Sequence, residues 1–517
     1  MKRMFKSRIT SRVSKKLSFA VSLILTLALL PVSVFANSGD IGYFGGITEG
    51  RRLPKTTELL LASENDDEEE VEFIYKEVIF LSGEPVEFEG LLSVESSGQV
   101  TEAENVGTYE VTYRVTASDT TGEDALIDRN IIFNVNWRRE GKQIIKDMES
   151  STWRETVRAG DVTFTLDERQ SYFNVSIIED HTAAVTYYRG DTSQRAVYTG
   201  GDTPTTHETY GSFYGYGCAW SNTETHRMDG TVYNDEWQMQ YQIRPSVSVS
   251  KTLQYTENEP TAISFDGNYK EVMANESGLF YDIFVSPPQF FDTPKTGSAN
   301  IPSANVFEQL IAPDLNFLKG HYAESDIKKL FAMQVLGGEP KFYIPNQAIT
   351  RSQYTTAIVK ALKLPLVEMP TENRRNPAVV MLFPDVSQDD PNFQFIMTAY
   401  KAGIAVGRSN GKFFADSPIQ REEALVILLR CLGLENLGLD PTPTTLFTDD
   451  GEISSWARRE LYAAERIGII SQDEDGHIHP KQQVTKAEAA ALIGSLINYM
   501  RSELKLDYAE HIVDYVY

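Results

Sequence analysis

The chain contains three copies of one helical pattern towards its C-terminal end. Each copy closes with a short turn and a basic residue, in the segments Pro345–Arg351, Ala415–Arg421 and Pro480–Lys486. Apolar residues follow the basic residue at offsets +3, +6, +7, +10 and +11, which in the first copy are Tyr354, Ala357, Ile358, Ala361 and Leu362. This spacing places them on one face of an α-helix. A fixed-period repeat of this kind decides the architecture before other elements are assigned.

Each copy also has an opening aspartate and an earlier helix. Asp314, Asp385 and Asp449 precede the closing basic residue by 37, 36 and 37 positions. An amphipathic pattern follows the aspartate, most clearly at 456–464, and a turn rich in Gly and polar residues comes next. Each copy is therefore predicted to be a helix, a turn and a second helix.

The start of the second helix is the most informative part of each copy. Thr350 with Gln353, and Thr485 with Glu488, have capping-box spacing. The basic residue then lies in the first helical turn, where the helix dipole opposes a cation. Helix N–H groups beside a cation can bind a carboxylate or a phosphate. The alternative is that each cation pairs with the opening aspartate of its own or a neighbouring copy.

With these motifs in view, the three copies resemble S-layer homology domains. The family pattern is an opening Phe-x-Asp, a Gly-Ile-x-x-Gly and a closing Ile-Thr-Arg-Ala-Glu, and the resemblance covers about residues 312–505. It implies repeats at 312–364, 383–434 and 447–505 that form an all-α, pseudo-threefold unit. It also implies that grooves in this unit bind an acidic secondary cell-wall polymer, often one carrying a pyruvate ketal.

The resemblance also assigns site residues. The closing cations Arg351, Arg421 and Lys486 match the charged groove residue of the family, and the opening aspartates Asp314, Asp385 and Asp449 match its Asp. The remaining matches are the aromatic residues Tyr322 and Trp456 and the glycines Gly338 and Gly407. The copies depart from the pattern at several positions, which include Pro391, Gln420, Gln472 and Lys486. We therefore expect one or two working grooves instead of three.

The N-terminal segment has the composition of an export signal. Residues 1–16 carry seven Lys or Arg and no acid, an apolar run follows, and a small-residue cleavage site ends at Ala36. Removing residues 1–36 would take the formal charge from −25 to −32, since seven positive charges leave with them. Such an acidic chain is unsuited to nucleic acid or to an anionic membrane surface. No later segment is apolar enough to span a membrane.

The region between the signal and the repeats is predicted to be rich in β-strands. Residues 37–70 read as an acidic flexible segment, and 71–136 alternate like a small immunoglobulin-like β-sandwich. Residues 137–285 read as a second β-rich domain of no assigned family, and 286–311 as a linker. The fold class is therefore multidomain α+β, with a β-sandwich-like N-terminal half.

One segment of the β-rich region leaves two interpretations open. Residues 210–220 are rich in aromatic residues and glycine, so they could form a sugar-binding platform or simply core strands with a tight loop. The His, Cys and acidic residues show no zinc or calcium spacing, and no cofactor motif is present. Cys218 and Cys431 lie too far apart in sequence for a disulfide framework.

These observations predict a non-enzymatic anchor of an exported protein. The repeats would bind a secondary polysaccharide in the wall of a Gram-positive-type bacterium, and the β-rich half would be displayed as part of a surface layer, where it could contact other surface-layer proteins. The alternative is a wall-tethered polysaccharide hydrolase, or a carbohydrate-binding protein, acting through residues 137–285. Carboxylate pairs for glycoside hydrolysis stay possible, because sequence does not show their separation.

Overall fold

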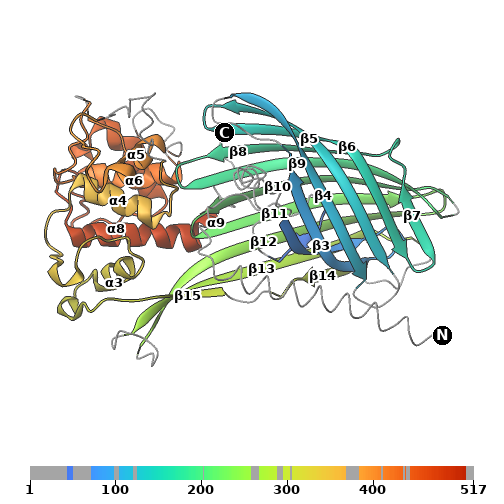
Figure 1. Cartoon of the computed structure of the whole chain (residues 1–517), viewed down its shortest axis with the longest axis horizontal. Coiled ribbons are helices and arrows are strands. Elements are labelled where there is room, and N and C mark those ends of the chain that lie inside the picture. Colours follow the sequence, from blue (N-terminus) through green and yellow to red (C-terminus); the bar gives the residue numbers. More distant parts are fainter. Residues whose placement is uncertain are drawn as a thin grey trace. The chain divides into compact units, whose positions relative to one another are not determined.

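Figure 1 shows a computed structural model of the chain, coloured along the sequence. It describes residues 44–49, 71–97, 104–119, 125–201, 203–257, 267–287, 295–302, 306–367, 383–408, 411–434, 437 and 443–507. The expected signal segment 1–36 lies outside these residues, as does most of the expected acidic segment 37–70. Within the described part, no helix combines the length and apolar character needed to cross a bilayer.

The N-terminal half is one antiparallel sheet of fifteen strands, in which most neighbours in space are also neighbours in sequence. The strands are β1 (Ile47–Thr48), β2 (Val71–Ile79), β3 (Val86–Ser96), β4 (Val106–Asp119), β5 (Leu126–Glu140), β6 (Gln143–Ala159), β7 (Val162–Leu166), β8 (Tyr172–His181), β9 (Val185–Thr199), β10 (Thr205–Cys218), β11 (Ser221–Tyr233), β12 (Gln238–Thr256), β13 (Asn268–Val285), β14 (Thr296–Asn300) and β15 (Val306–Leu310). β8 bridges β6 and β9, and β15 pairs with β13.

The alternation of buried and exposed side chains along the sequence explains why these segments form strands. Along β4 and β5, buried and exposed residues alternate almost without a break, as expected for a sheet with one face on a core and one in water. The buried face includes Val111, Val115, Ile131 and Phe133, all at most 1% exposed. A single hydrophobic core runs from β1 to the residues after β14.

The structure differs from the expectation of two separate β-domains. The expected boundary after residue 136 falls inside β5, which pairs with β4 on one side and β6 on the other. The expected linker 286–311 contains β14 and β15, which both pair with β13. The alternation predicted strands correctly, but it could not show that one sheet continues across both boundaries.

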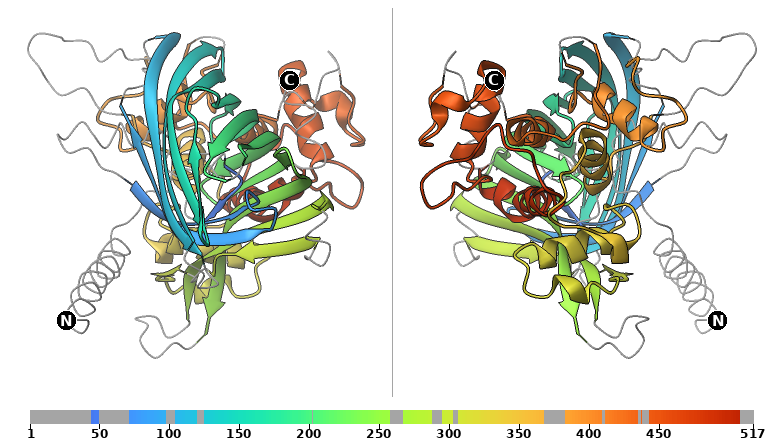
Figure 2. Two further views of the ribbon diagram at one scale, coloured as in Figure 1. Left: turned by 90° about the vertical axis from the view of Figure 1, so that its right-hand side faces the viewer. Right: turned by 90° about the vertical axis from the view of Figure 1, so that its left-hand side faces the viewer.

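The sheet curls, and a short N-terminal segment lies within the curl (Figure 2). β14 lies against β2, and β1 contacts both β12 and β13. β1 pairs with β2, and the Ser277 hydroxyl on β13 donates to the Thr48 carbonyl. A Cβ at Gly46 would stand 2.2 Å from the Tyr75 ring, so this close approach requires glycine. The segment therefore connects the two ends of the curled sheet.

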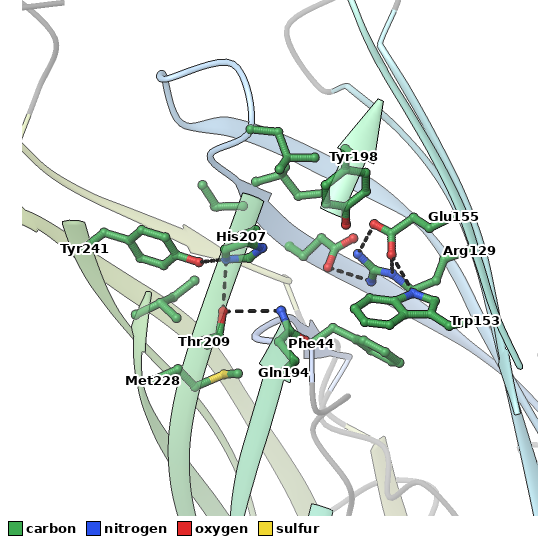
Figure 3. A pocket seen from close by; sticks show the side chains of 15 residues that line it. Phe44, Arg129, Trp153, Glu155, Gln194, Tyr198, His207, Thr209, Met228 and Tyr241 are labelled. Atoms are coloured by element: carbon green, nitrogen blue, oxygen red, sulfur yellow. Dashed lines mark hydrogen bonds and ion pairs between the residues drawn. The ribbon is translucent and has the colours of Figure 1, made fainter. Parts of the chain in front are cut away.

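A charged cluster is enclosed inside the curl, beside a cavity of about 30 Å³ (Figure 3). Arg129 makes two 2.8 Å hydrogen bonds to Glu155 and one of 3.0 Å to Glu77. Burial raises the pKa of Glu77. Burial would also raise that of Glu155, but the paired guanidinium more than offsets this and lowers it. The cavity has room for one or two water molecules and none for a sugar.

His207 on the same cavity makes a pH-dependent contribution to stability. Its Nε2 lies 2.6 Å from the Tyr241 hydroxyl, and burial lowers its pKa from 6.5 to about 4. Because the folded-state pKa is depressed, this contribution is complete above pH 6.5 and is lost as the pH falls towards 4. We expect His207→Gln to reduce the loss of unfolding free energy between pH 6.5 and 4 by on the order of 1–3 kcal/mol. Urea unfolding of both proteins across this range measures it, and equal pH slopes would contradict it.

The C-terminal part is helical. Its α-helices are α3 (Glu324–Ala332), α4 (Arg351–Ala361), α5 (Phe393–Lys401), α6 (Arg421–Leu432), α7 (Arg458–Arg466), α8 (Lys486–Asn498) and α9 (Leu504–Asp507). Short helical turns are η2 (Asn316–Leu318), η3 (Pro340–Phe342), η5 (Asp450–Glu452), η6 (Ser455–Ala457) and the π-helical η7 (Tyr499–Glu503). The repeat pattern placed α4, α6 and α8 correctly, each beginning at its closing basic residue.

The three repeats are joined in a ring just before α4, α6 and α8. Ile349 N–H donates to Val484, Val484 N–H donates to Ile419, and Ile419 N–H donates back to Ile349, at 2.9, 3.0 and 3.2 Å. Single β-bridges repeat the arrangement at Ala348–Thr485, Thr350–Pro418 and Gln420–Gln483. Each closing turn therefore contacts both of the others.

The sheet caps the far ends of the same helices. The last carbonyls of an α-helix have no partner within the helix, so other groups must satisfy them. Trp220 Nε1 donates to Ala361 O at the end of α4, and the Tyr187 hydroxyl donates to Leu432 O at the end of α6, both at 3.0 Å. Ser221 Oγ donates to Met500 O beyond α8. Within 210–220, residues 215–220 form the buried end of β10 and its tight loop, with Tyr216 and Trp220 fully enclosed, whereas Tyr210 is exposed.

Candidate functional site

The second and third opening aspartates hold the turn before the next helix. Asp385 accepts hydrogen bonds from the backbone N–H groups of Phe413 and Phe414, at 2.9 and 2.7 Å. Burial would raise the pKa of Asp385, but these N–H donors more than offset it and keep the pKa below its usual range. Asp449 likewise accepts hydrogen bonds from the backbone N–H groups of Ile478 and His479, at 3.1 and 2.7 Å. Both aspartates therefore stabilise the turn.

The turns that these aspartates hold contain left-handed residues. Phe414 and His479 have φ of 60° and 51°, a conformation that side chains larger than glycine rarely adopt. Asp314 in the first repeat accepts instead from Asn316, two residues on.

The helix N-termini do not offer the free N–H groups that the sequence suggested. The N–H groups of Arg351, Arg421 and Lys486 donate to Ser417, Gln482 and Gln347 of a neighbouring repeat, at 2.8–2.9 Å. The next N–H in each helix also donates to a neighbouring carbonyl, and the Thr350 and Thr485 side chains satisfy the following one in their helices. The prediction of anion binding by these N–H groups is therefore wrong, because the ring between repeats uses them.

Two of the three closing cations pair with a glutamate of the next repeat, at the third position of its second helix. Arg351 Nη1 lies 3.2 Å from Glu423 Oε1, and Arg421 Nη1 lies 3.8 Å from Glu488 Oε1. The corresponding position for Lys486 is Gln353, which has no charge, and Lys486 Nζ donates to Gln347 Oε1 at 2.8 Å. Pairing therefore occurs with these acids and not with the opening aspartates.

Arg351 is enclosed and committed to the fold. It is 5% exposed, Nη2 donates to Val406 O at 2.7 Å, and the guanidinium lies 5.1 Å from the centre of the Phe413 ring. Arg408 also pairs with Glu423, with two 3.0 Å hydrogen bonds. Glu423 is therefore shared by two arginines, and Arg351 has little surface on which to meet a ligand.

A more open arrangement surrounds the start of α8. We call it the α8 groove and define it by Tyr322, Tyr343, Arg421, Lys486 and Glu488. Tyr322 is 69% exposed. Partial burial and Glu488 raise its pKa, while a hydrogen bond with Thr485 and the charge of Arg421 oppose the rise, which places these groups around one ring.

The other side of the α8 groove is formed by the first repeat. The Tyr343 hydroxyl donates to Lys486 O at 2.9 Å, and Lys486 Nζ lies 5.7 Å from the centre of the Tyr343 ring. Burial raises the pKa of Tyr343, and the nearby Tyr322 phenol adds to the rise. The α8 groove thus combines two cations, two tyrosines and one carboxylate from three repeats.

Comparison with known proteins identifies the helical part. A family model of the S-layer homology domain matches residues 382–425 and 446–490. The S-layer protein sap of Bacillus anthracis is 30% identical over 31% of this chain and 18% of its own length. This chain is a surface protein with S-layer homology domains. It belongs to the cell wall and surface of a Gram-positive-type bacterium.

The other relatives differ in what their names describe. A cell surface protein of Thermoanaerobacter kivui is 34% identical over 22% of this chain and 14% of its own length. An amylopullulanase of Thermoanaerobacterium thermosulfurigenes is 32% identical over 35% of this chain and 9% of its own length. The chain thus spans less than a fifth of each relative named here. The relatives thus include both cell-surface proteins and a protein named as an enzyme.

The remaining expected site residues are one exposed aromatic residue and two glycines. Trp456 is 51% exposed, beside a cluster in which Ser454 and Lys481 bind Glu422. Gly338 has φ of 90°, so it provides a left-handed turn. At Gly407 a Cβ would lie 2.9 Å from the Phe383 ring, so this glycine allows close packing. Both glycines therefore shape the backbone.

Sequence reasoning missed Glu423, Glu488 and Tyr343. The two glutamates belong to the closing motif itself, and their signal was available: they occupy the third helical position, three residues from the cap. Their pairing with the preceding repeat's cation depends on the ring between repeats, which sequence does not show. Tyr343 had no signal beyond being an aromatic residue in a turn.

Proposed function

We propose that the three repeats form a pseudo-threefold anchor that binds an acidic secondary cell-wall polysaccharide without covalent attachment. The observation that carries the proposal is the α8 groove, where Arg421 and Lys486 stand beside two tyrosines. A carboxylate on the polymer, such as a pyruvate ketal, would receive charge-assisted hydrogen bonds from the cations. The exposed face of Tyr322 would pack against the apolar face of a sugar ring, and the buried Tyr343 would support it from behind.

The three closing cations are unequal in this proposal. Lys486 has no carboxylate at the helix position that pairs with the other two cations, and Arg421 pairs loosely at 3.8 Å. Both cations can therefore turn to a ligand at low cost. Arg351 would first have to leave a buried pair with Glu423, and breaking a buried pair is costly. We therefore assign polymer binding to the α8 groove, and a structural role to Arg351.

The sheet is then the displayed part of the molecule, and the anchor has no catalytic role. Glu77 and Glu155 are both buried and both paired with Arg129, and the cavity beside them has room for only a few water molecules. A polysaccharide hydrolase needs two carboxyl groups on either side of an accessible bond. This favours display over hydrolysis for the sheet.

Binding of residues 37–517 to isolated sacculi tests the proposal. We expect Arg421→Ala with Lys486→Ala to weaken binding at least a hundredfold, since each loses a charge-assisted hydrogen bond worth about 1.5–3 kcal/mol. Tyr322→Ala should weaken it about tenfold, through the lost ring. Arg459→Ala, an exposed cation on α7, is the matched control and should bind as the parent does.

The circular dichroism spectrum and melting temperature of each variant separate loss of the α8 groove from loss of fold. Unchanged binding by the folded double variant would place the site elsewhere. If the Arg351→Gln variant stayed folded but no longer bound sacculi, Arg351 would belong to the polymer-binding site, and the structural role assigned to it would be wrong.

A further inference from the structure

A row of polar side chains crosses the outer face of the sheet. The register pairs Tyr210 on β10 with Asp229 on β11, Asp229 with Gln242 on β12, and Gln242 with Asp282 on β13. Residues paired in this way lie side by side on one face, about 4.8 Å apart from strand to strand. The row therefore runs perpendicular to the strands for about 14 Å.

Hydrogen bonds hold these side chains in fixed positions. Gln242 Nε2 donates to Asp229 Oδ1 at 2.7 Å, and Arg244 Nη1 donates to Gln242 Oε1 at 2.9 Å. Arg244 Nη2 donates to Asp282 Oδ2 at 2.5 Å. Gln242 is itself buried, at 7% exposed, so it fixes the partly exposed side chains of Asp229 and Arg244 on either side of it. Polar groups held in this way are preorganised for contact with a ligand.

Exposed aromatic rings stand at both ends of the row. Tyr210 is 57% exposed, and Tyr172 of β8 is near enough to raise its pKa through a hydrogen bond and its charge. At the other end, Phe280 and Phe284 on β13 are 54% and 63% exposed, and they lie two residues on either side of Asp282. Grouped exposed rings with a polar surround are a mark of an interaction site.

We propose that the outer face of β8–β13 binds an uncharged polysaccharide that runs across the strands. The rings at the two ends stack on sugar faces, and the Asp229–Gln242–Arg244–Asp282 network hydrogen-bonds the hydroxyl groups between them. Vicinal hydroxyl groups donate to the carboxylates of Asp229 and Asp282 and accept from the Arg244 guanidinium, while the buried Gln242 amide holds these groups in place. The distance between the ring groups suits a short oligosaccharide and exceeds a single sugar.

The charges of this face decide between neutral and acidic polymers. Arg195 and Arg244 are each paired with an acid, at 3.7 Å to Glu208 and 2.5 Å to Asp282. Asp229 adds a further carboxylate, and the whole chain carries a formal charge of −25. An anionic chain would be repelled here, in contrast to the α8 groove with its two cations. The inference is thus independent of the anchor, and the two sites would recognise different glycans.

Titration calorimetry of residues 37–517 with chitohexaose, maltohexaose and cellohexaose tests the inference. We expect at least one of these neutral oligosaccharides to bind, and Tyr210→Ala and Phe280→Ala each to weaken that binding at least tenfold. Phe307→Ala is the matched control, because it removes an exposed ring from the same sheet outside the row. The Arg421→Ala, Lys486→Ala double variant should bind these oligosaccharides as the parent does, whatever its binding to sacculi.

Three results would overturn the inference. The first is no heat of binding for any of the three oligosaccharides at millimolar concentration. The second is binding that neither Tyr210→Ala nor Phe280→Ala weakens in protein that unfolds at the parent's temperature. The third is tighter binding of a uronic acid polymer such as hyaluronan hexasaccharide at this face, removed by the same two substitutions.

Discussion

Replacing Arg129 by methionine is expected to lower the free energy of unfolding by about 3–5 kcal/mol, because it leaves Glu77 and Glu155 buried without their cation. All three side chains are at most 5% exposed, so water cannot take over the role of the guanidinium. Urea unfolding at pH 7 measures the change. Adding Glu77→Gln and Glu155→Gln to Arg129→Met should recover a large part of it, since the uncompensated charges are then gone.

The control for this substitution is Arg138→Met. Arg138 pairs with Glu140 at 3.0 Å, but both side chains are about half exposed or more. An exposed pair of this kind is worth about 0–1 kcal/mol. If Arg129→Met cost no more than Arg138→Met, the enclosed charge cluster would not be a main support of the curled sheet.

The second large effect is expected at the contact between sheet and helices. Trp220 is fully buried among residues of both parts, and its Nε1 caps α4. Trp220→Ala should cost about 3–5 kcal/mol through the cavity that it leaves. Trp220→Phe keeps most of the ring and loses the hydrogen bond to Ala361 O, so it should cost less. Thermal unfolding followed at both the sheet and helix circular-dichroism bands measures the loss.

Trp456→Ala serves as the matched control, because Trp456 is half exposed on η6. It should change stability by less than about 1 kcal/mol.

A further consequence concerns the cooperativity of unfolding. Because the sheet caps α4 and α6, Trp220→Ala should separate the unfolding of sheet and helices into two transitions. A single unshifted transition would show that the contact does not couple the two parts.

The helical part was largely predictable because its signal is local and repeated. The apolar stripe that contains Tyr354, Ile358 and Leu362 is buried as expected, and the capping boxes at Thr350 and Thr485 form as their spacing predicted. What sequence could not show is the use of each helix's first N–H groups by the next repeat. That ring joins positions separated by up to about 140 residues, such as Ile349 and Val484.

In the β-rich part, the strands could be predicted from the sequence but their pairing could not. Alternation along 109–115 and 131–135 predicted strands that the structure contains in β4 and β5. Alternation states which face is buried but not which strands pair, since pairing depends on contacts between distant segments. The signal in 210–220 was ambiguous for the same reason: Tyr210 and Trp220 belong to one strand and its turn, yet one faces solvent and the other a buried contact.

The two proposed glycan sites would divide the binding of acidic and neutral polymers between the two parts of the molecule, according to their charge. The α8 groove places Arg421 and Lys486 near the exposed Tyr322 ring and would hold an acidic polymer. The outer face of β8–β13 pairs its arginines internally and would hold a neutral one. A surface protein built in this way would connect two different polysaccharides of the wall through the buried contact between sheet and helices that includes Trp220.

The most direct test of the anchor is co-sedimentation of residues 37–517 with sacculi, before and after acid extraction of the secondary polymer. We predict strong binding to intact sacculi, lost after extraction and lost in the Arg421→Ala, Lys486→Ala variant. Binding that survives extraction and is unaffected by that double variant would contradict the account, because the ligand would then be peptidoglycan and the α8 groove would not hold it.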